Sequence, residues 1–98
     1  MITNLIDFGM DPQEAAEAPR WNNFPGTSPP GVGKPFELRI EDRFGAETLQ
    51  GLERRGHAVT RNGPWGGGGA VQVILKDPDS GILLGGSDPR AEGVALGL

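Results

Sequence analysis

The order of apolar and polar residues predicts several short strands. Apolar residues alternate with charged ones in FELRIE, which is the pattern of a half-buried strand at 36–41. The segment AVQVILK at 70–76 is apolar on both faces apart from Gln72 and Lys76, which predicts a central strand covered on both sides. The turn residues DPDSG then predict a hairpin whose second strand returns at 82–85.

Helical spacing appears near the N-terminus and in the middle of the chain. At 2–9 the apolar residues gather on one side, which predicts the end of a buried helix that stops at Gly9. This helix starts at Met1 without room for a capping turn, as though it began further upstream. At 45–55 two leucines share one face and Gly56 follows as the stop, which predicts a second, amphipathic helix.

A short helix between these two has the most complete local signal. Asp11 is suited to cap it, Pro12 fits its first position, and Glu14 completes a capping box. Pro19 ends the alanine-rich stretch, so the helix is predicted at 12–18.

The remaining segments are rich in residues that break regular structure. The density of Asn, Pro and Gly from 21 to 35 predicts a long surface loop with neither helix nor strand. A short strand is predicted at 57–61, and a glycine-rich loop follows around Trp65. The sequence after 85 predicts a turn-rich tail.

Composition narrows the class of protein. The 17 Gly and 9 Pro make 26 of the 98 residues, near the level typical of disordered chains. The apolar residues nevertheless fall into patterned runs, which favours a small α+β domain with a thin core. The chain has no Cys, which excludes thiolate catalysis, disulfides and zinc knuckles.

Charge and hydropathy limit the classes of partner and the cellular locations to be expected. The formal net charge is -4, which leaves no surplus for a phosphate backbone, so nucleic-acid binding is not expected. No apolar run approaches the length of a membrane span, and no export signal opens the chain. The default expectation is therefore a cytoplasmic protein away from membranes.

Two features invite a reading as a ligand site. Four glycines at 66–69 precede a strand, but a phosphate-binding loop follows a strand and leads through a Lys and a hydroxyl residue into a helix. A connection that leaves room for neighbouring backbone is favoured. His57 is the single His and has no ligand partners at metal-binding spacing, so we expect an ordinary polar residue at a strand start.

Ser87 beside Asp88 suggests a nucleophile with a carboxylate, yet no base can be assigned to it. A turn is favoured in which Asp88 binds backbone amides and Arg90 pairs with a carboxylate. Asp77 and Asp79 lie in a predicted tight turn, where Asp and Ser bind their own backbone, so neither is expected to do acid–base work.

Three aromatic residues in predicted loops, Trp21, Phe24 and Trp65, leave two interpretations open. They could form a surface that stacks on a ligand. Aromatic residues in long loops more often hold those loops against the core, and this interpretation is favoured. The residues alone thus indicate an α+β piece with no catalytic set.

Several blocks taken together resemble the gamma-glutamyltranspeptidase family. They are IDFGMDPQEAAEAPRW, FELRIE, LERRGHAV and AVQVILKDPDSGILLGGSDPRAEG, in the order in which the family has them, and they cover nearly the whole chain. The blocks around DPQEAA and GGSDPR are the most specific. The chain resembles the C-terminal end of the family's small subunit. The resemblance implies an N-terminal nucleophile hydrolase with an α-β-β-α sandwich, which transfers or hydrolyses gamma-glutamyl groups of glutathione-type amides.

The resemblance also implies which parts are absent. The family's nucleophilic Thr, its serine pair and its oxyanion-hole glycines would lie upstream of Met1, and none of Thr3, Thr27, Thr48 or Thr60 stands in the nucleophile motif. Gly85 and Gly86 match the glycines before SDPR, which are not the oxyanion pair. No catalytic, cofactor-binding or metal-binding residue is therefore assigned, and no cofactor is expected.

The expected unit is a single incomplete domain over 1–98, left by truncation or by a gene that opens on an internal Met. Its expected partner is the remainder of the fold, or another copy of the chain. The alternative is a stand-alone interaction or oligomerisation module derived from this fold, without catalysis.

Overall fold

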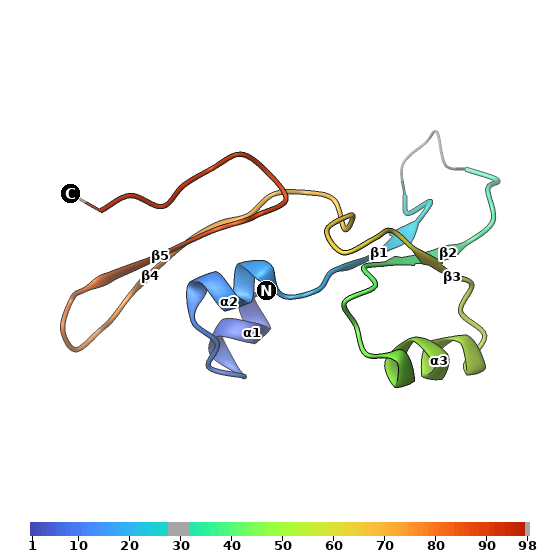
Figure 1. Cartoon of the computed structure of the whole chain (residues 1–98), viewed down its shortest axis with the longest axis horizontal. Coiled ribbons are helices and arrows are strands. Elements are labelled where there is room, and N and C mark those ends of the chain that lie inside the picture. The colour runs from blue at the N-terminus through green and yellow to red at the C-terminus, as the bar shows by residue number, and fades with distance from the viewer. Residues whose placement is uncertain (28–31, 98) are drawn as a thin grey trace. The chain divides into compact units, whose positions relative to one another are not determined.

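The computed structural model describes residues 1–27 and 32–97 and divides into two compact units. The first unit comprises Met1–Ala18 and Gly68–Leu98, and the second comprises Pro19–Gly67. Both contain helices and strands, which confirms the predicted α+β class (Figure 1). No helix of the described residues is long and apolar enough to cross a bilayer.

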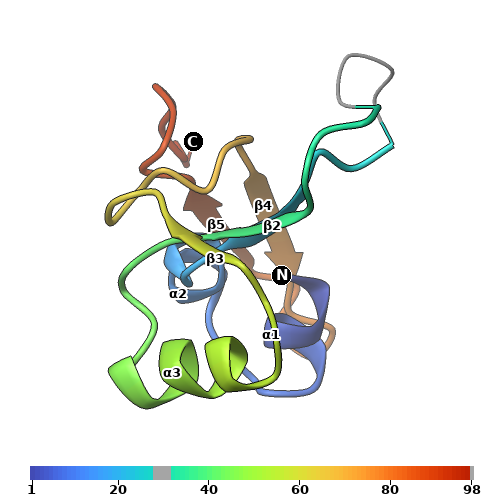
Figure 2. The same ribbon diagram turned by 90° about the vertical axis from the view of Figure 1, so that its right-hand side faces the viewer.

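The second unit is a three-stranded sheet with one helix on one side of it (Figure 2). Its elements in chain order are β1 (Trp21–Phe24), β2 (Glu37–Ile40), α3 (Ala46–Arg54) and β3 (Val59–Arg61). The central strand β2 pairs antiparallel with β1 and parallel with β3, and α3 makes the crossover that parallel pairing requires. Ile40 and Leu49, exposed by only 2% and 1%, form the apolar core here.

Strand β1 contradicts the prediction of an unbroken loop over 21–35. Its four residues pair with β2 in the register Trp21↔Ile40 to Phe24↔Glu37. Asn has a low strand propensity and Pro25 follows at once, so the local signal is that of a loop. Pairing along the regular strand β2 overrides that signal. The predicted loop residues 28–31 lie outside the described part.

The first unit packs two short helices against a hairpin (Figure 1). Its elements are α1 (Ile2–Ile6), α2 (Pro12–Glu17), β4 (Gln72–Lys76) and β5 (Leu83–Ser87). The hairpin is antiparallel, with Gln72 opposite Ser87 and Lys76 opposite Leu83. Helix α2 lies against both strands, and α1 lies against α2. Pro12, Ala15 and Ala16 are the buried residues of α2.

Strand β5 continues to Ser87, past the predicted end at 85. Gly85 and Gly86 allow this because, without side chains, they leave room for the segments that pack on the strand. A Cβ at Gly86 would lie 2.5 Å from the carbonyl oxygen of Pro12, and one at Gly85 would lie 2.8 Å from the Cβ of Ala95. Helix α2 and the C-terminal segment thus approach the backbone of β5 from its two faces.

Two predictions about buried faces in this unit are wrong for the chain by itself. The helix at 2–9 ends at Ile6, ahead of the left-handed Gly9, and its apolar residues are not buried: Ile6 is 76% and Phe8 70% exposed. The strand at 70–76 is not central, because it has one neighbouring strand, and Ile74 on its second face is 76% exposed. Among the described helices and strands, α1 packs chiefly on α2, and α2 lies on the face of the hairpin that carries Gly86, opposite to Ile74.

The other predicted elements are confirmed with small shifts. Helix α3 ends at Arg54 and Gly56 follows with φ +90°, in the predicted position for the stop. Strand β3 begins at Val59, two residues later than predicted. The capping box of α2 is complete, since Asp11 accepts from the amides of Gln13 and Glu14, and the Glu14 side chain accepts from the amide of Asp11.

This box gives a first testable prediction. Asp11→Ala leaves two first-turn amides without their acceptor and should lower the free energy of unfolding of the chain by about 1 kcal/mol. Asp11→Asn is the matched control, because its side-chain oxygen still caps the helix. Equal urea midpoints for the Ala variant and the unaltered chain would show that the cap contributes nothing.

Candidate functional site

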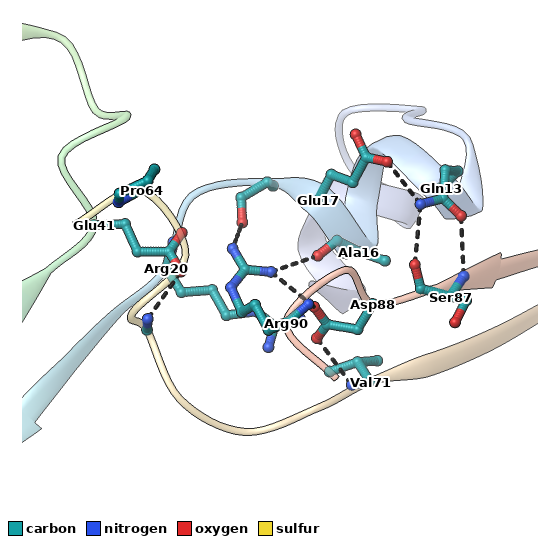
Figure 3. A network of polar contacts seen from close by, with 12 residues as sticks. Gln13, Ala16, Glu17, Arg20, Glu41, Pro64, Val71, Ser87, Asp88 and Arg90 are labelled. Atoms are coloured by element: carbon teal, nitrogen blue, oxygen red, sulfur yellow. Dashed lines mark hydrogen bonds and ion pairs between the residues drawn. The ribbon is translucent and has the colours of Figure 1, made fainter. Parts of the chain in front are cut away.

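Two buried carboxylates are the centres of the polar contacts, one in each unit (Figure 3). Asp88 follows β5 in the first unit, and Glu41 follows β2 in the second. Their exposed fractions are 1% and 0%. Because a buried charge is costly unless it is paired and hydrogen-bonded, the partners of each carboxylate decide what it can do.

Asp88 joins the residue before β4 to the turn after β5. Its Oδ2 accepts from the amide of Val71 at 3.0 Å, and its Oδ1 accepts from the amide of Arg90 at 3.0 Å. The same Oδ1 accepts from Nη1 of Arg90 at 3.1 Å, in an ion pair whose side chains are 0% and 2% exposed. These contacts confirm the predicted turn, in which Asp88 binds backbone amides and Arg90 pairs with a carboxylate.

Arg90 also binds the end of helix α2. Its Nη1 donates to the carbonyl of Ala16 and its Nη2 to the carbonyl of Ala18, both at 3.0 Å. The last carbonyls of a helix lack intrahelical donors, and a cation there is favourable. Arg90 therefore connects the helix end to the turn after β5.

Gln13 makes a second connection between α2 and β5. Its Nε2 donates to the carbonyl of Ser87, and its Oε1 accepts from the amide of Ser87, both at 3.0 Å (Figure 3). The side-chain amide takes the place that a neighbouring strand would occupy. No pattern in the sequence points to Gln13, since a Gln inside a capping box carries no signal of a distant partner.

Glu41 organises the second unit in a similar way. Its Oε2 accepts from the amide of Arg20 at 3.0 Å and from Nη2 of Arg43 at 2.8 Å, and its Oε1 accepts from the amide of Gly67 at 2.9 Å. The alternation over 36–41 suggested a solvent-facing Glu, whereas the side chain is fully buried. Two of the partners that compensate its burial, the amides of Arg20 and Gly67, come from segments far apart in sequence, so no local pattern could reveal them.

Arg43 and Gly67 complete this cluster. The Arg43 Nε donates to the carbonyl of Pro64 at 2.6 Å, and its guanidinium lies 3.6 Å from the centre of the Trp65 ring. A Cβ at Gly67 would lie 2.7 Å from Oε1 of Glu41. The predicted role of the glycine run, room for neighbouring backbone, is confirmed at Gly66, where a Cβ would overlap the carbonyl of Asn62, whereas at Gly67 the close neighbour is a side chain.

The three aromatic residues Trp21, Phe24 and Trp65 have different surroundings. Trp65 is 41% exposed beneath Arg43, and Phe24 is half-buried with the Arg39 guanidinium 3.5 Å from its ring centre. Trp21 lies on strand β1 and is 61% exposed. The prediction that these residues hold loops against the core is therefore wrong for Trp21.

The structure gives Ser87 no catalytic partner among the described residues. Its Oγ is buried and has no hydrogen-bond partner there, and both oxygens of Asp88 accept from other groups. A nucleophilic hydroxyl needs a base within hydrogen-bond reach. His57 is exposed and precedes β3 by two residues, and no three potential ligand side chains are grouped for a metal within residues 1–27 and 32–97.

Asp77 and Asp79 form the predicted turn. Oδ1 of Asp77 accepts from the amide of Asp79 at 3.0 Å, and Oδ2 accepts from the Ser80 hydroxyl. These bonds, chiefly the one from Ser80, lower the pKa of Asp77 below its ordinary value of 3.8. The pair is explained by the turn, as predicted.

Comparison with known proteins decides the family. The family model for gamma-glutamyltranspeptidase matches residues 1–98. The chain belongs to the gamma-glutamyltranspeptidase family. It is 37% identical over 99 residues to a glutathione hydrolase-like proenzyme, YwrD, of Bacillus subtilis (strain 168). It is also 37% identical over 91 residues to the glutathione hydrolase proenzyme of Escherichia coli (strain K12).

The match is with a small part of these gamma-glutamyltranspeptidase relatives. All of this chain aligns with 18% of the Bacillus subtilis protein, and 93% of it aligns with 14% of the Escherichia coli protein. Among solved structures, cephalosporin acylase from Bacillus halodurans superimposes with a TM-score of 0.71 and 36% identity, over 91% of this chain and 15% of that one. The chain is thus similar also to a protein named as an acylase.

The Asp88–Arg90 pair gives a prediction about stability. Asp88→Ala leaves Arg90 buried without its carboxylate and should lower the free energy of unfolding by about 3–5 kcal/mol, the usual cost of breaking a buried ion pair. Asp79→Ala, in an exposed turn, is the matched control and should change little. A loss below about 1 kcal/mol for the first variant, measured by denaturant titration, would contradict a structural role.

A pH titration checks the turn. A lowered pKa means that ionised Asp77 stabilises the folded turn at pH above 3.8, and that this contribution is lost as the pH falls through the lower, folded-state pKa. Carboxyl NMR should find the pKa of Asp77 below 3.8 in the unaltered chain and higher in Ser80→Ala. The same value in both would assign the shift to another cause.

Proposed function

We propose that the chain is the C-terminal part of the small subunit of a gamma-glutamyltranspeptidase-like enzyme. In this proposal it supplies strands and covering helices to an N-terminal nucleophile hydrolase sandwich of the α-β-β-α type. The chain is then one incomplete domain over 1–98, and its partner is the rest of the fold. The reaction is transfer or hydrolysis of gamma-glutamyl groups, with the nucleophile outside this chain.

The amount of exposed apolar surface in the first unit carries this proposal. Its buried apolar residues, Ala15 and Ala16, are small, whereas eleven of its larger apolar residues are exposed to solvent. They are Met1, Ile2, Ile6, Phe8, Ile74, Leu75, Ile82, Leu83, Leu84, Val94 and Leu96, each 39% exposed or more. So many exposed large apolar side chains in a unit of this size are typical of a surface that contacts other polypeptide. The relatives contain such polypeptide, because this chain spans less than a fifth of their length.

The contacts of the two carboxylates support a structural role. An acyl transfer needs a nucleophile, a base and oxyanion donors directed at one point. Both oxygens of Asp88 and both of Glu41 accept hydrogen bonds that join chain segments. In this proposal the clusters hold the shape of the piece on which a remote active centre is built.

Two assays test the proposal. The purified chain should release no product from a gamma-glutamyl anilide, because no nucleophile with a base is assigned to it. In the second assay, this chain replaces the aligned segment of the Bacillus subtilis relative. The chimera should recover self-cleavage and glutathione hydrolysis that the same relative lacks when its segment is deleted.

The controls separate this role from the alternative of a stand-alone module. Asp88→Ala within the chimera should reduce the yield of cleaved protein, whereas Asp79→Ala should not. Turnover by the chain alone that survives repurification and disappears on changing one of its residues would overturn the structural role. A compact monomer by light scattering that binds no hydrophobic dye, together with an inactive chimera, would favour an independent domain.

A further inference from the structure

The backbone groups of the β4–β5 hairpin divide into an inner and an outer set. The amide of Asp77 donates to the carbonyl of Ile82, and that of Asp88 donates to the carbonyl of Val71, so these pairs face inward. Antiparallel pairing alternates, and the residues between them face outward in turn. The outward set is Gln72, Ile74 and Lys76 on β4, and Leu83, Gly85 and Ser87 on β5.

The outer edge of β5 is already occupied at one end. Both backbone groups of Ser87 are bound by the side chain of Gln13, and helix α2 lies against this strand. A strand that added to β5 would have to displace the Gln13 amide. The far end, at Leu83 and Gly85, leaves room for two outward residues only.

The outer edge of β4 is open along its whole length. Within residues 1–27 and 32–97, no hydrogen bond is found for the outward backbone groups of Gln72, Ile74 or Lys76. The strand has no Pro, and its one charged residue, Lys76, stands at its end, so little along the rest of the strand prevents strand addition. The adjoining face is apolar and largely exposed, with Ile74 76% and Leu83 64% exposed, and the C-terminal segment reaches it at Gly85.

We propose that the outer edge of β4, at Gln72, Ile74 and Lys76, pairs with a β-strand from a segment of the family fold that lies outside this chain. This inference rests on the proposed function. The relatives supply such a segment, because 82% of the Bacillus subtilis protein lies outside the 18% that aligns. A second copy paired through β4 would lengthen the sheet and leave the Ile74 and Leu83 face uncovered, whereas a sandwich partner covers both edge and face.

Hydrogen exchange provides a test that needs no substitution. The full chain is co-expressed with the Bacillus subtilis relative lacking its aligned segment, and the complex is purified through a tag on the chain. The amides of Ile74 and Lys76 should exchange rapidly in the chain alone and become protected in the complex. The amides of Leu83 and Gly85 are the internal control and should stay rapid, because they face the other edge.

Matched proline variants test the same edge by co-purification. Ile74→Pro removes an outward amide while leaving the inner ladder of the hairpin, and should reduce capture about tenfold or more. Ile74→Ala controls for the lost side chain, and Leu83→Pro removes the corresponding amide on β5. Both should retain most of the capture. Unchanged exchange at the inward Val73 amide verifies that the hairpin of each variant is folded.

The possible outcomes distinguish a failure of the β4-edge proposal from a failure of the proposed function. Capture by the unaltered chain that is lost in Leu83→Pro but kept in Ile74→Pro would overturn the β4 edge and leave the proposed function standing. Failure of the unaltered chain to capture the truncated relative would overturn both. Dimers of the chain alone that dissociate in Ile74→Pro would identify a second copy as the occupant, against this proposal.

Discussion

The first unit depends on the hydrogen bonds and the ion pair that the guanidinium of Arg90 makes. It is 2% exposed and binds the carboxylate of Asp88 together with two carbonyls at the end of α2. Asp88 in turn binds the amide of Val71, just before β4. The pair therefore connects one short helix to both strands of a hairpin, at its open end, more than fifty positions away in the sequence.

This arrangement follows from how little apolar surface the chain buries. Ala15, Ala16, Ile40 and Leu49 are its buried hydrophobic residues among those described. Small domains bury a limited fraction of their surface, and in this chain few apolar side chains contribute to the buried part. Charge-assisted hydrogen bonds from Asp88 and Glu41 provide positional specificity that such a small core cannot. Their cost is that each carboxylate depends on all its partners, since a buried charge left unpaired is strongly unfavourable.

Close backbone approach is the second constraint on the first unit. At Gly86 the helix carbonyl of Pro12 occupies the space where a side chain would lie, and this proximity lets Gln13 reach both backbone groups of Ser87. The glycine pair, the capping box and the DPR turn are thus parts of one contact between α2 and β5. This contact gives a physical reason for the two sequence blocks that most resemble the gamma-glutamyltranspeptidases, since they meet in space.

The sequence by itself determined the elements whose signals are local. The capping box at Asp11, the Asp77 turn and the stop at Gly56 depend on residues within four positions of one another, so their chemistry is complete in the sequence. The bond from the amide of Arg90 to Asp88 was predicted for the same reason. Family membership also followed from sequence, because the order of the blocks is itself a linear property.

Only the tertiary structure decided which faces and edges are covered. Strand β1 forms because its backbone can hydrogen-bond to β2, although its asparagines have a low propensity for strands. Glu41 is buried because amides from Arg20 and Gly67 reach it, and Gln13 binds β5 because α2 lies there. The exposure of Ile74 could not be predicted either. An apolar pattern indicates that a face is buried in the complete fold, but not whether residues of the same chain bury it.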